Sequence, residues 1–438
     1  MPAGWPRASR RTFLGGVLKS AGAIGAASVA GGLLAGCDRT TQVPVGRPIR
    51  VGFVSAQTGP LGAFGEADNF ILADVRRALA GGVRIGARSH PFEIVVKDNQ
   101  SDAGRARTVA TDLIEGQRID IVLTHGAPET INPVADVCEQ AEVPCISSSA
   151  PWQAWLYGRG GDTTHGFRWT YHFFWGMEDV IRVFSDLWQQ VPTNHVVGPL
   201  FAKNVDGDTW ASAEHGLPGV LGHAGYRFVR TPRPADSASD FSVQIQRFLD
   251  EKAEILTGNP ASPDFATFWK QAGDRGYRPK VATVGKALLF PTFVEAMSPP
   301  ADGLSSEVWW SPAFPYRSSL TGASATQLAA EYTRQTGKQW TQPLGFDHAL
   351  FEVAVDVVRR AGDLDDRTAV VEAIKDTRLA TIVGPLDWSR GGVPNVARTP
   401  LVGGQWRAGT SFPYDLVIVT NTGHPEIPVA GKLRPLGR

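Results

Sequence analysis

Apolar and polar residues follow each other along most of the chain in blocks that predict strands and helices in turn. Residues 49–55 and 92–98 are short runs rich in β-branched residues that end in turn residues, which predicts buried strands. Between them, residues 66–82 carry apolar side chains at helical spacing and end in a glycine pair. The alternation continues through helical segments 104–116 and 131–142 and strand-like runs 119–124 and 143–149. This order predicts βαβ units on a parallel sheet.

A second series of strands and helices begins near residue 175. Helical segments alternate there with short apolar runs as far as residue 285. Residues 344–362 then predict one long amphipathic helix, and residues 384–423 have the pattern of β-hairpins. Two such series in a chain of 438 residues predict an α/β protein with two lobes.

The first 36 residues have the layout of an export signal, with a cationic start, an apolar stretch and small residues at its end. The paired Arg10 and Arg11 resemble a twin-arginine signal, and the sequence LAGC ending at Cys37 resembles a bacterial lipobox. Cleavage before Cys37 would leave that residue acylated, followed by a linker to residue 47. The alternative is an ordinary secretory signal with an incidental cysteine. The first interpretation predicts an extracytoplasmic protein anchored to a membrane through lipid.

Two cysteines remain if Cys37 carries lipid. Cys138 and Cys145 lie where a predicted helix turns back onto a predicted strand, and exported proteins retain disulfides. The sequence therefore favours a disulfide between them over the alternative of two buried free thiols.

Charge and motifs narrow the possible functions. The chain has 43 basic and 43 acidic residues without a basic stripe, so nucleic acid is not an expected partner. It lacks a nucleophile elbow, a zinc-protease motif and a phosphate-binding loop. The histidines have no metal-ligand spacing, and Asp206 and Asp208 are not followed by the glutamate of a calcium loop. No catalytic residue, metal or cofactor is predicted.

Aromatic residues gather in three stretches that the pattern predicts as loops: residues 147–158, 165–176 and 307–316. Trp152 follows directly on a serine run at a predicted strand end, where open parallel sheets bind ligands. We therefore expect Trp152 to form a pocket wall, whereas packing between lobes is the expectation for the other rings.

The chain resembles the type I periplasmic substrate-binding proteins, in the branch of the Leu/Ile/Val-binding protein of ABC importers. The segments that carry the resemblance are residues 49–65, 95–114 and 119–151, together with Gly384, Pro385, Leu386 and Trp388. The resemblance implies two doubly wound α/β lobes joined by a three-stranded hinge. The implied boundaries are 48–171 with 312–399 for the first lobe and 172–311 with 400–430 for the second.

The resemblance also implies a ligand site between the lobes. With Trp152 added from the aromatic pattern, the expected ligand-binding residues are Phe64, Ala127, Pro128, Glu129, Thr130, Ser148, Ser149, Ala150, Trp152, Asp206, Asn259 and Lys286. Lys286 falls where the family has an acidic residue that pairs with a ligand ammonium, and like charges there repel. An apolar or aromatic ligand, including an acid or amide, is therefore expected in place of a plain branched-chain amino acid.

These observations predict a monomeric, extracytoplasmic solute-binding lipoprotein that delivers a small organic ligand to the permease subunits of an ABC importer. Three alternatives stay open. They are a receptor lipoprotein that passes its ligand to a signalling partner, a branched-chain amino acid binder, and an enzyme on the same fold.

Overall fold

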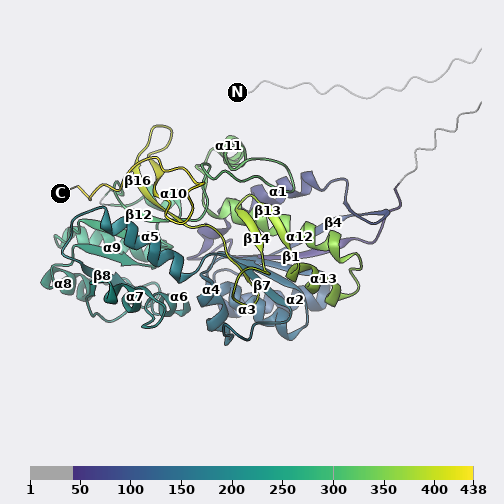
Figure 1. Ribbon diagram of the computed structural model, residues 1–438, viewed down its shortest axis with the longest axis horizontal. Helices are drawn as coiled ribbons and strands as arrows, with labels where there is room; N and C mark the ends of the chain where they lie inside the picture. Colours follow the sequence, from purple (N-terminus) through teal and green to yellow (C-terminus); the bar gives the residue numbers. More distant parts are fainter. Residues whose placement is uncertain (1–42, 299, 438) are drawn as a thin grey trace, which may run out of the picture. The chain divides into compact units, whose positions relative to one another are not determined.

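The computed structural model describes residues 43–298 and 300–437, and its strands form two large sheets (Figure 1). The predicted export signal, Cys37 and most of the following linker lie outside the described residues. Within the described part of the chain, no helix is both long and apolar enough to cross a membrane.

The first sheet is built from parallel strands, as the βαβ pattern predicts. Its order is β15 (Val396–Ala397), β7 (Thr170–Phe173), β6 (Cys145–Ser148), β5 (Ile121–His125), β1 (Ile49–Ser55) and β4 (Phe92–Asp98). Helices α2 (Ala103–Gln117) and α3 (Pro128–Gln140) share a core with one face of the sheet. Helices α1 (Asp68–Ala78) and α12 (Pro343–Ala361) pack in the core on the other face. Burial on both faces explains why these strands are almost continuously apolar.

The second sheet combines five parallel strands with an antiparallel edge. Its order is β17 (Tyr414–Thr420), β16 (Val402–Ala408), β12 (Ser305–Val308), β11 (Val281–Val284), β10 (Ile255–Gly258), β8 (Val196–Leu200) and β9 (Arg227–Phe228). Only β16 is antiparallel to both of its neighbours, β12 and β17. The helices of this part are α5 (Met177–Gln189), α6 (Val205–Trp210), α7 (Leu217–His223), α8 (Ser242–Asp250), α9 (Ser262–Asp274) and α10 (Pro291–Glu295).

The chain passes between the two sheets at three places: after β7, after β12 and after β15. The remaining elements are hairpins β2 (Val83–Ile85)/β3 (Arg88–His90) and β13 (Arg378–Thr381)/β14 (Gly384–Asp387), helices α4 (Trp152–Leu156), α11 (Ala325–Thr336) and α13 (Arg367–Lys375), and the 3-10 turns Gly62–Ala67 and Tyr157–Arg159. The two-lobed α/β fold is therefore confirmed. The residue boundaries of the lobes stay a prediction, and β7 of the first sheet runs two residues past the predicted boundary at 171.

Several predicted elements agree closely with the structure. The strands predicted at 49–55 and 92–98 have those bounds, and the long amphipathic helix runs from Pro343 to Ala361. The aromatic stretches differ, because the predicted loop 165–176 contains β7 and the predicted loop 307–316 begins within β12. Every residue of both strands is buried, so neither shows the alternation that identifies a half-exposed strand.

A buried charged cluster joins α12 to the first sheet. His125, at the end of β5, places Nε2 3.0 Å from Oδ1 of Asp68 and Nδ1 3.0 Å from Oδ1 of Asp347. Ser55 donates a hydrogen bond of 2.5 Å to the other oxygen of Asp68. Burial lowers the pKa of His125, but the two carboxylates outweigh this effect and raise it to about 10. The carboxylates face opposite ring nitrogens, an arrangement that suits an imidazolium better than a single metal ion bound by all three side chains.

Cys138 and Cys145 are free, buried thiols in the structure, in place of the disulfide that the sequence favours. Cys138 lies on α3 and Cys145 begins β6, and the two side chains are close enough to hydrogen bond. Burial, followed by the neighbouring Cys145, raises the pKa of Cys138. Because the thiolate is the species that forms disulfides, this environment slows oxidation.

Replacing His125 by glutamine tests the buried cluster. The substitution leaves Asp68 and Asp347 without a cation, so we expect the free energy of unfolding at neutral pH to fall by about 3–5 kcal/mol. In the unmodified chain, the native state keeps the His125 proton that the unfolded state loses above about pH 6.5. Its stability should therefore decrease as the pH rises from about 6.5 towards 10, and His125→Gln should remove this dependence.

Urea unfolding at several pH values in this window measures both effects. His165→Gln is the matched control, because the side chain of His165 is 85% exposed. Parallel stability curves for the unmodified chain and His125→Gln would contradict this account of the cluster.

Candidate functional site

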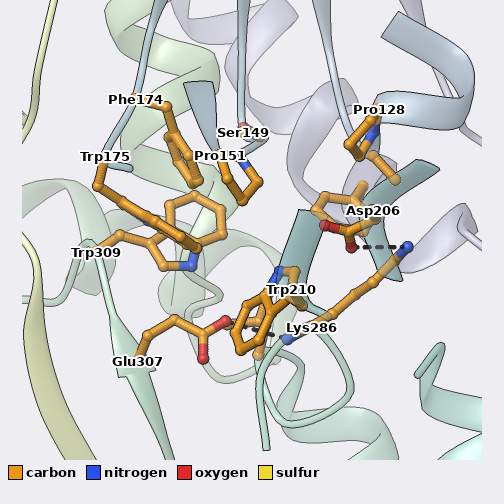
Figure 2. Close-up of a pocket in the computed structure, with 13 residues that line it drawn as sticks. Pro128, Ser149, Pro151, Phe174, Trp175, Asp206, Trp210, Lys286, Glu307 and Trp309 are labelled. Atoms are coloured by element: carbon orange, nitrogen blue, oxygen red, sulfur yellow. Dashed lines mark hydrogen bonds and ion pairs between the residues drawn. The ribbon is translucent and has the colours of Figure 1, made fainter. Parts of the chain in front are cut away.

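The principal candidate site is a small cavity between the two sheets, which we call the inner pocket. Figure 2 shows its lining residues: Phe64, Ala127, Pro128, Ser149, Pro151, Phe174, Trp175, Asp206, Trp210, Lys286, Leu289, Glu307 and Trp309. From the first sheet, Pro128 follows β5, Ser149 follows β6 and Trp175 follows β7. The carboxyl ends of adjacent parallel strands therefore deliver this side of the pocket.

The second sheet supplies the opposite side in the same way. Asp206 and Trp210 lie on α6, which follows β8, and Lys286 follows β11. Trp309 comes directly after β12, and Glu307 lies within that strand. Residues far apart in the sequence thus meet at one place because their strands point towards it.

Aromatic rings form most of the pocket wall. The ring of Phe174 lies 5.1 Å from that of Trp309 and 4.8 Å from that of Trp175, measured between centroids. Phe64 contacts Phe290 edge to face at 5.0 Å and so brings the two sides together. Walls of this kind bind flat, apolar parts of ligands, while a few polar groups fix the orientation.

Four buried hydrogen-bond donors of the pocket have no acceptor among the described residues. They are the indole N–H groups of Trp175, Trp210 and Trp309 and the hydroxyl of Ser149. The three tryptophans are between 1% and 3% exposed. A buried donor without a partner costs about 1–3 kcal/mol, so such groups are unusual and call for an explanation.

The ammonium of Lys286 is held between carboxylates from both sides of the pocket. Its Nζ lies 3.3 Å from Oδ2 of Asp206 and 3.5 Å from Oε2 of Glu129, and the lysine side chain is 8% exposed (Figure 2 shows the Asp206 contact). Burial lowers the pKa of Lys286, but Glu129 and Asp206 outweigh this effect and raise it. Burial raises the pKa of Asp206, and Lys286 partly opposes the rise. The charge of Lys286 is therefore already neutralised by protein groups.

Glu307 lies at the base of the pocket and is buried. Its carboxylate accepts a hydrogen bond of 3.0 Å from the backbone N–H of Lys286 and one of 2.9 Å from the hydroxyl of Ser306. Burial raises the pKa of Glu307 to about 7 despite these two donors. The carboxyl group is consequently protonated for part of the time near neutral pH.

The backbone is strained on both sides of the pocket. Ser149 has a φ of 76° and Lys286 a φ of 57°, values in the left-handed region that side chains disfavour. Each such residue costs about 1–3 kcal/mol, and this kind of strain gathers at ligand-binding positions. Both strained residues line the inner pocket.

The pocket is closed in this conformation, with a free volume of about 20 Å³. That volume accommodates about one water molecule. A second cavity of about 520 Å³, which we call the outer cavity, lies beyond Lys286 and Glu129, both of which line it. A ring-sized solute can therefore occupy the inner pocket only if the two sides move apart.

The structure brings together half of the residues predicted to bind ligand. Six line the inner pocket: Phe64, Ala127, Pro128, Ser149, Asp206 and Lys286. Glu129 lines the outer cavity, and Asn259 lies behind the pocket, where it contacts Asp206.

The other four predicted residues are not on the wall of the inner pocket. The hydroxyl of Ser148 donates to the backbone of Phe173 at 2.7 Å, and that of Thr130 donates to the backbone of Ala127 at 3.1 Å. The backbone oxygen of Ala150 is held by His172 at 2.8 Å.

Trp152 also differs from its expected position. Its indole N–H donates to Glu178 at 3.0 Å, and its ring packs against Tyr157. Helix α4 begins at Trp152 and turns this ring away from the inner pocket towards the start of α5. Trp152 therefore packs between Tyr157 and the start of α5, a structural role that the sequence suggests only for the other rings.

Seven wall residues are not among those predicted to bind ligand: Pro151, Phe174, Trp175, Trp210, Leu289, Glu307 and Trp309. Phe174, Trp175 and Trp309 line the pocket, so the expectation that these rings only pack between the lobes is wrong. Trp210 comes four residues after Asp206, so a predicted helix there would have placed both side chains on one face. Glu307 is not predicted as a site residue because it lies within β12, a strand that the sequence pattern predicts as part of a loop.

Comparison with known proteins places this geometry in a family context. Residues 48–410 match the family described as "Periplasmic binding protein". No curated protein sequence matches the chain.

Three solved structures illustrate the similarity of fold. The leucine-binding protein LivK of Thermotoga maritima is 17% identical, with 86% of this chain and 99% of that chain covered and a TM-score of 0.68. LivJ of Streptococcus pneumoniae, solved with isoleucine, is 16% identical over 85% of this chain and 99% of its own, with a TM-score of 0.65. A solute-binding protein of Rhodopseudomonas palustris, solved with 3,4-dihydroxybenzoic acid, is 15% identical over 86% and 99%, with a TM-score of 0.67.

Replacing Lys286 by methionine tests the buried ion pairs. The substitution keeps a long side chain but leaves Asp206 and Glu129 unpaired, so we expect the free energy of unfolding to fall by about 3–5 kcal/mol near pH 8. The loss should be smaller near pH 5, because burial raises the pKa of Asp206 and the unpaired carboxyl group can then bind a proton.

Urea unfolding of the variants measures this loss. Lys280→Met is the matched control, since Lys280 pairs with Glu254 at 3.0 Å while its side chain is 43% exposed, and such pairs contribute about 0–1 kcal/mol. Equal losses for the two variants would show that the Lys286 pairs do not stabilise the closed arrangement.

Proposed function

The chain belongs to the periplasmic binding protein family and has the type I fold of its Leu/Ile/Val-binding members, and we propose that its inner pocket captures a small apolar or aromatic solute for an ABC importer. Proteins of this family bind small molecules, work with ABC permeases outside the cytoplasm, and are not enzymes. The observation that carries the proposal is the closed aromatic pocket between the sheets, with its unpartnered donors.

The character of the pocket favours an apolar or aromatic solute over a plain branched-chain amino acid. Five of its wall residues are aromatic: Phe64, Phe174, Trp175, Trp210 and Trp309. Lys286 occupies the carboxylates of Asp206 and Glu129 that could pair with the ammonium of an amino acid, and this pairing leaves no free cation for a carboxylate. The aromatic acid bound to the Rhodopseudomonas palustris neighbour supports the same class of ligand by analogy.

Capture requires the two sides of the pocket to separate and close again. Opening would break the ion pair between Lys286 and Glu129 and separate Phe64 from Phe290. A ligand that bridges both sides would shift the population towards a closed, filled form. Hinge closure of this kind gives the permease a signal that the solute is bound.

Delivery to a permease fits a lipid-anchored protein. We propose that the export signal is removed before Cys37 and that acylation of this residue tethers the protein to a membrane as a monomer. Intact mass spectrometry of membrane-derived protein reports on the anchor, because acylated Cys37 would be its first residue.

A ligand screen on the purified full chain tests the capture function. Amino acids, aromatic acids, amides and sugars are added in thermal-shift assays, together with native mass spectrometry for solutes that copurify. A ligand at a hundredfold excess over its Kd stabilises the protein by about 2.7 kcal/mol. We expect at least one aromatic or apolar solute to raise the Tm and Trp309→Ala to abolish the shift.

Trp340→Ala is the matched control, since Trp340 is a partly buried ring outside the inner pocket. No stabilising solute and no copurifying mass would argue against solute capture. Stabilisation that Trp309→Ala leaves intact would instead move the binding site away from the inner pocket.

A further inference from the structure

The polar groups of the inner pocket indicate which ligand it selects. We propose, on the basis of the capture function above, that the ligand is an uncharged aromatic compound with a hydrogen-bond acceptor such as a carbonyl oxygen, held by the indole N–H groups of Trp210 and Trp309. The acceptor would satisfy donors that the protein leaves unpaired, and the ring would lie among the aromatic walls.

The first step in the argument is the donor set. An indole N–H donates hydrogen bonds and accepts none, so Trp210 and Trp309 can be satisfied only by acceptors. Both side chains are at most 2% exposed, and neither N–H has a partner among the described residues. In Figure 2 the pyrrole edges of these two tryptophans turn towards the middle of the pocket. Trp175 and Ser149 add two further unpartnered donors to the wall.

The second step is the charge of the pocket wall. Asp206 and the partly protonated Glu307 line the pocket, and its lining includes no arginine, so an anionic ligand would meet acidic groups without a free cation. The Asp206 carboxylate already pairs with the Lys286 ammonium at 3.3 Å, so a cationic ligand group would have to displace Lys286 to pair with it. An uncharged ligand needs no counter-ion from the wall.

The third step is shape. Phe174 contacts Trp175 at 4.8 Å and Trp309 at 5.1 Å between centroids, and Phe64 stands on the first-sheet side of the same pocket. Rings at these spacings favour stacked or edge-on contact with another ring. A flat ligand can therefore enter between them with a smaller opening than a branched one requires.

Four matched compounds test the proposal by calorimetric titration of the full chain. Benzamide carries a neutral acceptor, benzoate a negative charge, benzylamine a positive charge, and toluene neither an acceptor nor a charge. We expect benzamide to bind most tightly, roughly three- to tenfold more tightly than toluene. The two charged compounds should bind more weakly than benzamide.

Variants identify the donors. Trp210→Phe and Trp309→Phe keep a ring but remove the N–H, so each should weaken benzamide binding by roughly three- to tenfold. Toluene binding should change by less than about twofold, since toluene accepts no hydrogen bond. Trp340→Phe is the control outside the pocket and should change neither. If a variant does not fold, the order of the four compounds on the unmodified chain still decides the question.

Other outcomes would overturn the proposal. Tightest binding of benzoate would indicate an anion site, and tightest binding of benzylamine would indicate an aromatic cage for a cation. Equal effects of the tryptophan variants on benzamide and toluene would show that ring contact alone holds the ligand. If none of the four binds while an amino acid or sugar does, the ligand assignment fails and the capture function stands. If no solute of any class binds, the capture function fails as well.

Discussion

Parallel strands deliver the residues that follow them to one edge of a sheet, and this constraint decides where the inner pocket lies. Pro128, Ser149 and Trp175 follow three adjacent strands of the first sheet, while Asp206 and Lys286 follow strands of the second. These five residues lie at least 20 positions apart from one another in the sequence. The βαβ topology therefore builds the site, and side-chain chemistry only decides what the site can hold.

Burial of charge is the next constraint on the site. An ammonium such as that of Lys286 cannot remain inside a closed pocket without anions, and Asp206 and Glu129 provide them from opposite sides. Lys286 also has a left-handed backbone conformation, a strain that the surrounding structure must support. The same logic governs His125, whose two carboxylates bind α1 and α12 to the first sheet. Charged groups in this protein thus join segments that are distant in sequence.

The sequence predicts the parts of this arrangement that depend on local pattern. Strands β1 and β4 follow from β-branched runs, whereas Phe64, Asp206 and Lys286 follow only from the resemblance to the family. Trp152 follows a predicted strand end, yet its ring points elsewhere because α4 starts there and Glu178 accepts its N–H. The contact of Asp68 with Asp347 through His125 depends on how α12 packs, which periodicity does not report.

The position of the aromatic wall links pocket opening to the motion of the lobes. Trp175 comes two residues after β7 and Trp309 directly after β12, at two of the places where the chain passes between the sheets. A change of backbone angle at these segments must therefore move the rings that line the pocket. Since the closed pocket has a free volume of only about 20 Å³, a solute cannot enter before the segments bend. In the proposed capture mechanism, hinge bending and opening of the aromatic wall are consequently one motion, and a ligand stacked between these rings would act directly on the hinge.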